Sequence, residues 1–196
     1  MTMNFETLRA ANIARQEEWP GNDKADPAFR ALEVADEVGE VMGAVKKWLR
    51  AQRDIAGTTL TLEDVADEIG DTYVSLDLFM HALALPPLPG IMPGALDDEI
   101  KASDLALEAY VSAGHIVDSF LRYEHSETNN EREARRFDVR DDCLNLIIGI
   151  ESLASYLGID TNTAVVAKFN KTSEKYGMAT RMETPETGSR QPGERE

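Results

Sequence analysis

The sequence predicts an all-α protein, a bundle of about six helices. Apolar residues recur at helical spacing along most of the chain, and no segment alternates apolar and polar residues as a half-buried strand does. Residues that commonly start helices stand directly before several of these periodic segments, and glycine or proline follows their ends. Together these observations favour helices joined by short connections.

The first two helices are expected over residues 4–18 and from Pro27 to about Arg53. Asn4 is a plausible N-cap of the first, which ends where Trp19-Pro20-Gly21-Asn22 breaks the pattern. Asp26 offers an N-cap to the second, and Pro27 suits its first helical position because the missing N–H has no partner there anyway.

The third helix is expected to begin at Thr61, with Asp64 completing a capping box, and to continue to Pro86-Pro87. A connector then leads to a fourth helix, whose positive end suits Asp97, Asp98 and Glu99 and which reaches about His125.

A fifth helix is predicted over residues 131–157 and a sixth from Asp160 or Thr161 to Gly177, with Gly158 as a left-handed cap between them. Residues 183–196 contain proline, glycine, serine and charges without a large apolar residue, and are expected to be disordered. Residues 1–182 are therefore predicted to form a single domain.

Composition restricts the class of partner. The chain has 196 residues with 20 basic and 36 acidic side chains, a formal net charge of −16, which repels nucleic acid and anionic lipid surfaces. Its single cysteine, Cys143, excludes an intramolecular disulfide, and residues 1–15 lack the apolar core of a signal peptide. We expect a soluble cytoplasmic protein that binds neither nucleic acid nor membranes.

The chain also shows an internal similarity. Residues 31–48 align without gaps onto residues 106–123, which predicts a degenerate second copy over about residues 95–157. In this alignment Ser112 and His115 stand where the first copy has Glu37 and Glu40. The alternative is that amphipathic helices align easily with one another.

Two acidic motifs lie on the second and third expected helices, Glu37-Val38-Gly39-Glu40 and Glu68-Ile69-Gly70-Asp71. Each places two carboxylates three residues apart, and therefore on one helical face. A glycine inside a helix costs roughly 1 kcal/mol relative to alanine, yet both motifs have one directly before the second acid. Close helix crossing is expected to explain both glycines.

Helical wheels place Glu37 and Glu68 at the edges of the two apolar arcs, with Glu40 and Asp71 farther round. Packing the arcs together brings four carboxylates along one seam, where they repel each other unless a cation neutralises them. Ligand sets made only of oxygen favour Mg²⁺ or Mn²⁺.

The acids have two other interpretations. Acidic side chains commonly form a solvated helix face, but two pairs at the same wheel position with the same internal glycine favour a site. A ferritin-like di-iron centre needs Glu-x-x-His, and no glutamate stands three residues before any of the three histidines.

The ordered motifs E-V-G-E and E-I-G-D resemble the ExxE and ExxD signature of the MazG-like, all-α nucleoside triphosphate pyrophosphohydrolases. Residues 153–160 and 164–177 are similar to the closing helices of the same family, so the resemblance covers about half of the chain. It departs between Pro86 and about Val139, where a typical single domain passes quickly to its last helix. The related dimeric dUTPases resemble fused duplications.

The resemblance implies Mg²⁺-dependent hydrolysis of a (deoxy)nucleoside triphosphate to a monophosphate and pyrophosphate, which would remove unwanted or excess nucleotides. Carried over by position, the metal ligands and catalytic acids are Glu37, Glu40, Glu68 and Asp71. The phosphate contacts are Lys168 and Lys171, with Asn170 and Lys175 as further candidates. The family also implies a homodimer, although a true duplication would make a monomer equally reasonable.

Base recognition is expected from Trp19 and Trp48, whose aromatic faces can stack on a base. Asn12, Gln16 and Asn22 can read a base edge by hydrogen bonds. The sequence does not name the base or the sugar. Two alternatives stay open, a phosphoribosyl-ATP pyrophosphohydrolase and a non-catalytic helical scaffold.

Overall fold

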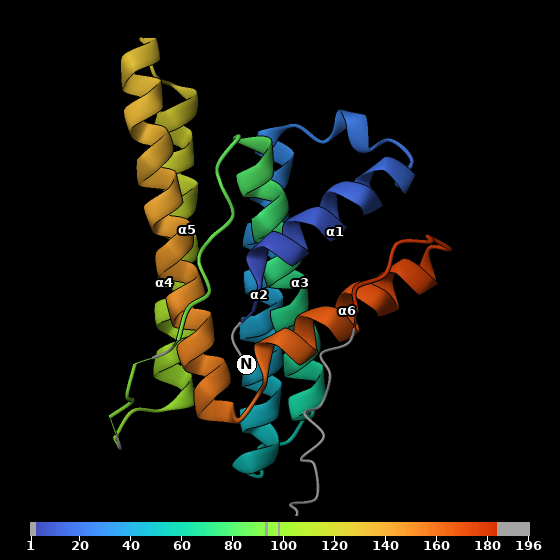
Figure 1. Cartoon of the computed structure of the whole chain (residues 1–196). Coiled ribbons are helices and arrows are strands. Elements are labelled where there is room, and N and C mark those ends of the chain that lie inside the picture. Colours follow the sequence, from blue (N-terminus) through green and yellow to red (C-terminus); the bar gives the residue numbers. More distant parts are fainter. Residues whose placement is uncertain (1–2, 93, 98, 184–196) are drawn as a thin grey trace, which may run out of the picture.

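The computed structural model describes residues 3–92, 94–97 and 99–183, and throughout these ranges the chain forms helices without a strand. The all-α prediction of about six helices is confirmed. In chain order the elements are α1 (Phe5–Glu18), the 3₁₀ helix η1 (Asn22–Lys24), α2 (Pro27–Gln52), α3 (Leu62–Ala82), α4 (Ala102–Glu124), α5 (Asn129–Leu157) and α6 (Thr161–Lys175) (Figure 1).

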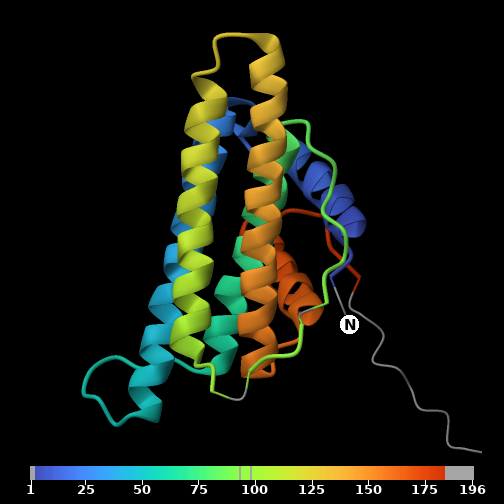
Figure 2. The same cartoon turned by 90° about the vertical axis from the view of Figure 1, so that its left-hand side faces the viewer.

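Two antiparallel hairpins, α2–α3 and α4–α5, lie side by side and form the body of the bundle (Figures 1 and 2). Helices α1 and α6 pack against α3 from the other side, so α3 contacts α1, α2, α5 and α6. The end of the α4–α5 hairpin extends beyond the other helices (Figure 2). The paired hairpins are compatible with an internal repeat, which stays a prediction.

The predicted helix starts agree with the capping hydrogen bonds. Asn4 and Asp26 accept backbone N–H groups at the starts of α1 and α2, and Thr61 and Asp64 form the expected capping box of α3. Helix α4 instead begins at Ala102, later than expected, because Asp97 accepts the N–H of Glu99 in a separate turn. Asp98 lies outside the described residues.

Helix α3 ends at Ala82, before the proline pair that was expected to stop it. Ala84 has a left-handed backbone (φ 53°), and the N–H of Leu85 donates to the carbonyl of Met80 at 2.9 Å. Leu85 and Leu88 are both buried, so the connector is fixed by apolar contacts directly after the helix. Packing of these leucines therefore ends the helix earlier than proline would.

A buried polar cluster fixes α1 on α3. The Asp77 carboxylate accepts hydrogen bonds from Arg9 Nε and Asn12 Nδ2, each at 2.9 Å. All three residues are buried. This gives Asn12 a structural role, in place of the base-reading role considered from the sequence.

The two motif glycines differ in their surroundings. A Cβ on Gly70 would lie 2.6 Å from Lys168 Cβ and 3.0 Å from the carbonyl oxygen of Ala164, so α6 crosses α3 directly over this glycine. A Cβ on Gly39 would meet no atom within 4 Å. The expectation of close crossing is therefore correct for Gly70 and wrong for Gly39.

No single helix within the described ranges has the length and apolar character needed to cross a bilayer. The tail expected to be disordered falls, apart from its first residue Glu183, outside the described residues.

Candidate metal centre and adjoining groove

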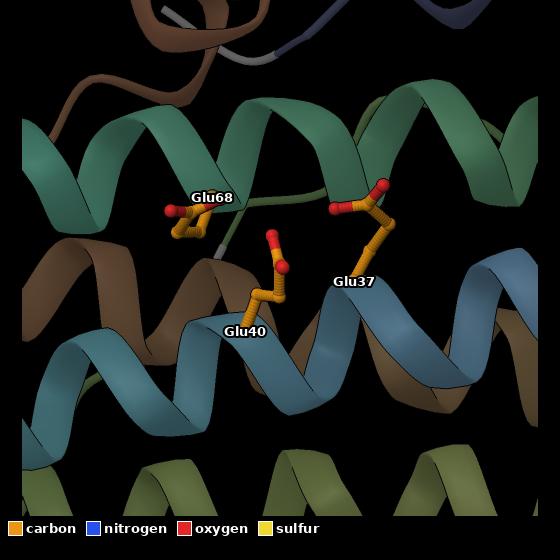
Figure 3. A group of neighbouring side chains, drawn as sticks. All are labelled: Glu37, Glu40 and Glu68. Carbon is orange, nitrogen blue, oxygen red and sulfur yellow. The ribbon is translucent and has the colours of Figure 1, made fainter.

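Three glutamates of the two motifs converge where α2 and α3 run antiparallel. Glu37 and Glu40 project from consecutive turns of α2 toward α3, which contributes Glu68 (Figure 3). One carboxylate oxygen from each residue lies within 4.8 Å of the other two. The predicted seam of acids therefore exists for these three residues.

We call Glu37, Glu40 and Glu68 the glutamate triad. Two of its carboxylate oxygens have no hydrogen-bond partner among the described residues. Glu37 Oε2 and Glu68 Oε2 are shielded from solvent and accept no hydrogen bond from any described residue. Buried carboxylate oxygens are normally paired, because leaving one unsatisfied costs about 1–3 kcal/mol or more. The triad therefore offers carboxylate oxygens without protein partners, a donor set that fits Mg²⁺ or Mn²⁺.

The electrostatics of the triad agree with this geometry. Burial, followed by the charges of Asp71, Glu40 and Glu68, raises the pKa of Glu37 to about 8. Burial also raises the pKa of Glu68, against the opposing effect of Lys168. Without a cation, the site therefore favours a protonated Glu37 at neutral pH.

Asp71, the fourth predicted ligand, lies beside the triad and forms an ion pair. Its Oδ2 is 2.8 Å from Lys168 Nζ, which also lies 3.9 Å from Asp67. Lys171 pairs with the same Asp67. Burial raises the pKa of Asp71 despite its bond to Lys168. The two predicted phosphate-binding lysines thus lie on the α6 side of the acids.

A groove of about 480 Å³ begins at Glu37 and Asp71 and continues under the turn that follows α1. Its walls come from α1, this turn, α2, α3 and Thr172 of α6. Trp19 and Phe29 are its aromatic lining residues, and Trp19 also packs on Tyr176 with ring centroids 4.9 Å apart. The groove therefore joins an acidic end to an aromatic end.

The remaining predicted substrate contacts lie elsewhere. Trp48 packs partly buried against the hydrophobic core and is not among the residues that line the groove. Asn170 is hydrogen-bonded through both side-chain atoms to the backbone of Met182. Lys175 Nζ lies 5.1 Å above the Tyr176 ring. Trp19 thus lines the groove that leads to the acids, whereas these three residues do not line it.

Two groove arginines were missed by the sequence reasoning. Arg15 is 3% exposed and lies in the last turn of α1, four residues before Trp19. Arg30 is also buried and donates hydrogen bonds to Gln16, Asn22 and Glu33. No local pattern in the sequence identifies Arg15 as a groove residue, because Trp19 lies outside α1 in an extended conformation and the contact of Arg15 with Phe169 joins distant parts of the chain.

Comparisons with known proteins found no matching family model, no matching curated protein and no matching solved structure.

Proposed function

We propose that this protein is a Mg²⁺-dependent nucleoside triphosphate pyrophosphohydrolase of the MazG-like type, acting in removal of unwanted nucleotides. The observation that carries the proposal is the glutamate triad, in which one carboxylate oxygen from each residue lies within 4.8 Å of the other two. In the same group Glu37 Oε2 and Glu68 Oε2 are buried and accept no hydrogen bond from a described residue. Its position at one end of a groove with an aromatic opposite end suits a ligand that joins polyphosphate to a flat ring.

The three triad glutamates would hold the metal, with Asp71 available when Lys168 turns away. A bound Mg²⁺ supplies positive charge for phosphate oxygens and lowers the pKa of a coordinated water. In the overall reaction, water adds across the bond between the α and β phosphates, giving the monophosphate, pyrophosphate and a released proton. One carboxylate of the group serves as the general base.

The lysines of α6 are proposed to bind the polyphosphate. Lys171 is mostly exposed and, within the part of the chain that the structure describes, pairs with Asp67, so it can turn toward a ligand. Lys168 is half-buried between Asp67 and Asp71. In a chain with a net charge of −16, these two ammonium groups provide local attraction for an anionic substrate.

Trp19 is proposed as the stacking surface for the base. Gln16 and Asn22 line the groove next to it, with their carbonyl oxygens accepting from Arg30. Their amide N–H groups are then oriented by Arg30 and available to a base edge. This arrangement supports a nucleotide substrate without selecting one base.

The test is to incubate the protein with each common dNTP and NTP in Mg²⁺ and to separate monophosphate from diphosphate products. Wild type should form monophosphate and pyrophosphate, and Glu37→Gln and Asp71→Asn should lose at least a hundredfold in rate, since truncating catalytic groups removes factors of about 10²–10⁴. Glu63→Gln is the matched control, because Glu63 is an exposed acid on the same helix as Asp71. Turnover unaffected in both site variants would refute the assignment.

Metal binding separates an enzyme from a non-catalytic scaffold. Binding to the folded state alone raises the free energy of unfolding by RT ln(1 + [L]/Kd), about 2.7 kcal/mol at a hundredfold excess over Kd. Millimolar Mn²⁺ should therefore raise the melting temperature of wild type and of Glu63→Gln, but not of Glu68→Gln. An unchanged melting temperature in wild type would favour the scaffold.

A homodimer is proposed from the family resemblance. Leu107, Tyr110 and Val111 on α4 are each more than half exposed and provide an apolar surface that a second copy can cover. Sedimentation of wild type against Leu107→Glu tests this proposal, and a monomeric wild type would refute it.

A further inference from the structure

Arg15 is a buried cation whose hydrogen-bonding capacity is largely unused. It is 3% exposed, and its one hydrogen bond to a described residue runs from Nη1 to the carbonyl of Phe169 at 3.2 Å. The guanidinium carbon lies 3.7 Å from the centre of the Phe169 ring, and Nε is buried without a partner. A guanidinium has five N–H donors, so most of them are free for a ligand.

The position of Arg15 in the groove limits what that ligand is. Along α3 the groove passes from Leu78 to Asp71, and along α2 it passes from Arg30 to Glu37. Glu40 and Glu68 lie beyond its acidic end. The groove is therefore a path with Trp19 and Arg30 toward one end and the triad at the other.

Arg15 lies between these ends. Arg15 and Trp19 both line the groove, and Asp71 at its acidic end acts electrostatically on Arg15. Burial lowers the pKa of Arg15 to about 10, and the charge of Asp71 opposes this lowering. Lys168 and Lys171 approach the same acids from α6, on the side of Asp67. Two positive regions therefore flank the acidic cluster, and of Arg15, Lys168 and Lys171 it is Arg15 that lines the groove.

We propose that Arg15 binds the phosphate attached to the nucleoside and so fixes the direction of the substrate in the groove. The base lies on Trp19, the α-phosphate lies between Arg15 and the triad, and the β and γ phosphates extend toward Lys168 and Lys171. This inference rests on the proposed function, because it assigns an orientation to the substrate of that reaction.

The test is a binding cycle that isolates the phosphate. Calorimetry in Mg²⁺ measures the affinity of each deoxynucleoside and of its 5′-monophosphate for wild type and two variants. Arg15→Met removes the guanidinium and keeps the aliphatic stem. Arg122→Met is the control, because it removes the same charge from an exposed position on α4. Wild type and Arg122→Met should bind the monophosphate more tightly than they bind the nucleoside. In Arg15→Met the ratio of these two affinities should fall roughly tenfold or more. Nucleoside affinity should not change.

Two further measurements distinguish binding from a structural role, since Arg15 also joins α1 to α6 through Phe169. Pyrophosphate and Mn²⁺ should bind Arg15→Met as they bind wild type. A parallel loss of all ligands would make Arg15 a structural clamp and overturn the proposal, as would an unchanged phosphate advantage.

If Arg15→Met fails to fold, the Arg15 Nε–H signal of ¹⁵N-labelled wild type provides the test, identified by its absence from Arg15→Lys. The chemical shift of this signal should change on titration with the monophosphate and not with the nucleoside. A chemical shift that changes with neither ligand overturns the proposal. Monophosphate binding through Arg15 in a protein that hydrolyses no triphosphate would refute the proposed reaction while leaving this site in place.

Discussion

Lys168 Nζ lies 2.8 Å from Asp71 Oδ2, so a lysine of α6 neutralises the last acid of the second motif. The contact depends on Gly70, the residue before Asp71, because a Cβ there would approach Lys168 Cβ to 2.6 Å. The bond to Asp71 and the nearby Glu68 and Asp67 raise the pKa of Lys168 although burial lowers it. The glycine and the aspartate of this motif thus seat the same lysine.

Replacing Lys168 should separate metal binding from turnover. In Lys168→Met, Asp71 loses its ion-pair partner and becomes available to a cation, so Mn²⁺ affinity should rise severalfold. Triphosphate hydrolysis should fall at least tenfold, because a charged phosphate contact is lost. Calorimetry with Mn²⁺ and a pyrophosphate-release assay measure the two effects.

Lys101→Met, which removes an exposed lysine at the start of α4, should change neither quantity. Weaker Mn²⁺ binding in Lys168→Met would show that Lys168 supports the metal site instead of competing with it.

The stability of the metal-free protein should decrease as pH rises. Burial and the charges of Asp71, Glu40 and Glu68 raise the pKa of Glu37 from 4.5 to about 8 in the folded chain. Between these values the folded state holds a proton that the unfolded state has released. Its contribution to the free energy of unfolding is therefore complete below pH 4.5 and is lost as pH approaches 8.

Urea unfolding in EDTA across this range measures the effect. Glu37→Gln, which cannot ionise, should show a flatter pH dependence than wild type and should become the more stable of the two above pH 8. Glu63→Gln should keep the wild-type slope. Mn²⁺ affinity should change in the opposite direction and increase with pH, since a cation requires the ionised carboxylate. Parallel curves for wild type and Glu37→Gln would contradict the assigned shift.

Much of the fold could be predicted because its determinants are local. Asn4, Asp26 and Thr61 cap helices through contacts within three residues, and Gly158 ends α5 with φ 71°. The same applies to the glutamate triad, because helical periodicity places Glu37 and Glu68 at the edges of two apolar arcs that pack together, with Glu40 one turn from Glu37.

The rest depends on contacts between distant parts of the chain. Arg15 meets Phe169 across 154 positions, and no local pattern indicates that α1 and α6 converge there. Trp19 and Trp48 are equivalent candidates in sequence, but of the two it is Trp19 that lines the groove leading to the acids, and the packing of α1 on α3 places it there. The two motif glycines are also equivalent in sequence, and only the packing of α6 shows that Gly70 is covered and Gly39 is not.

The buried Asp77 should be a determinant of stability independent of the metal site. Asp77→Ala leaves the Arg9 guanidinium, whose side chain is 11% exposed, without its carboxylate, which should cost about 3–5 kcal/mol. Asp118→Ala removes the exposed partner of Arg122 and should cost about 1 kcal/mol or less. Chemical denaturation measures both. A loss near 1 kcal/mol in Asp77→Ala would show that this pair does not hold α1 on α3.

The two motif glycines give a matched pair of substitutions with opposite signs. Gly39→Ala places a methyl group in open space within α2 and should stabilise the fold by roughly 0.5–1 kcal/mol, because alanine loses less backbone entropy in a helix. Gly70→Ala places the same group against Lys168 and the Ala164 carbonyl and should destabilise it by about 1–3 kcal/mol. Because that clash displaces α6, Gly70→Ala should also weaken triphosphate hydrolysis, whereas Gly39→Ala should retain it. Denaturation and turnover measured on both variants test the crossing, and equal stability changes would show that α6 does not lie against Gly70.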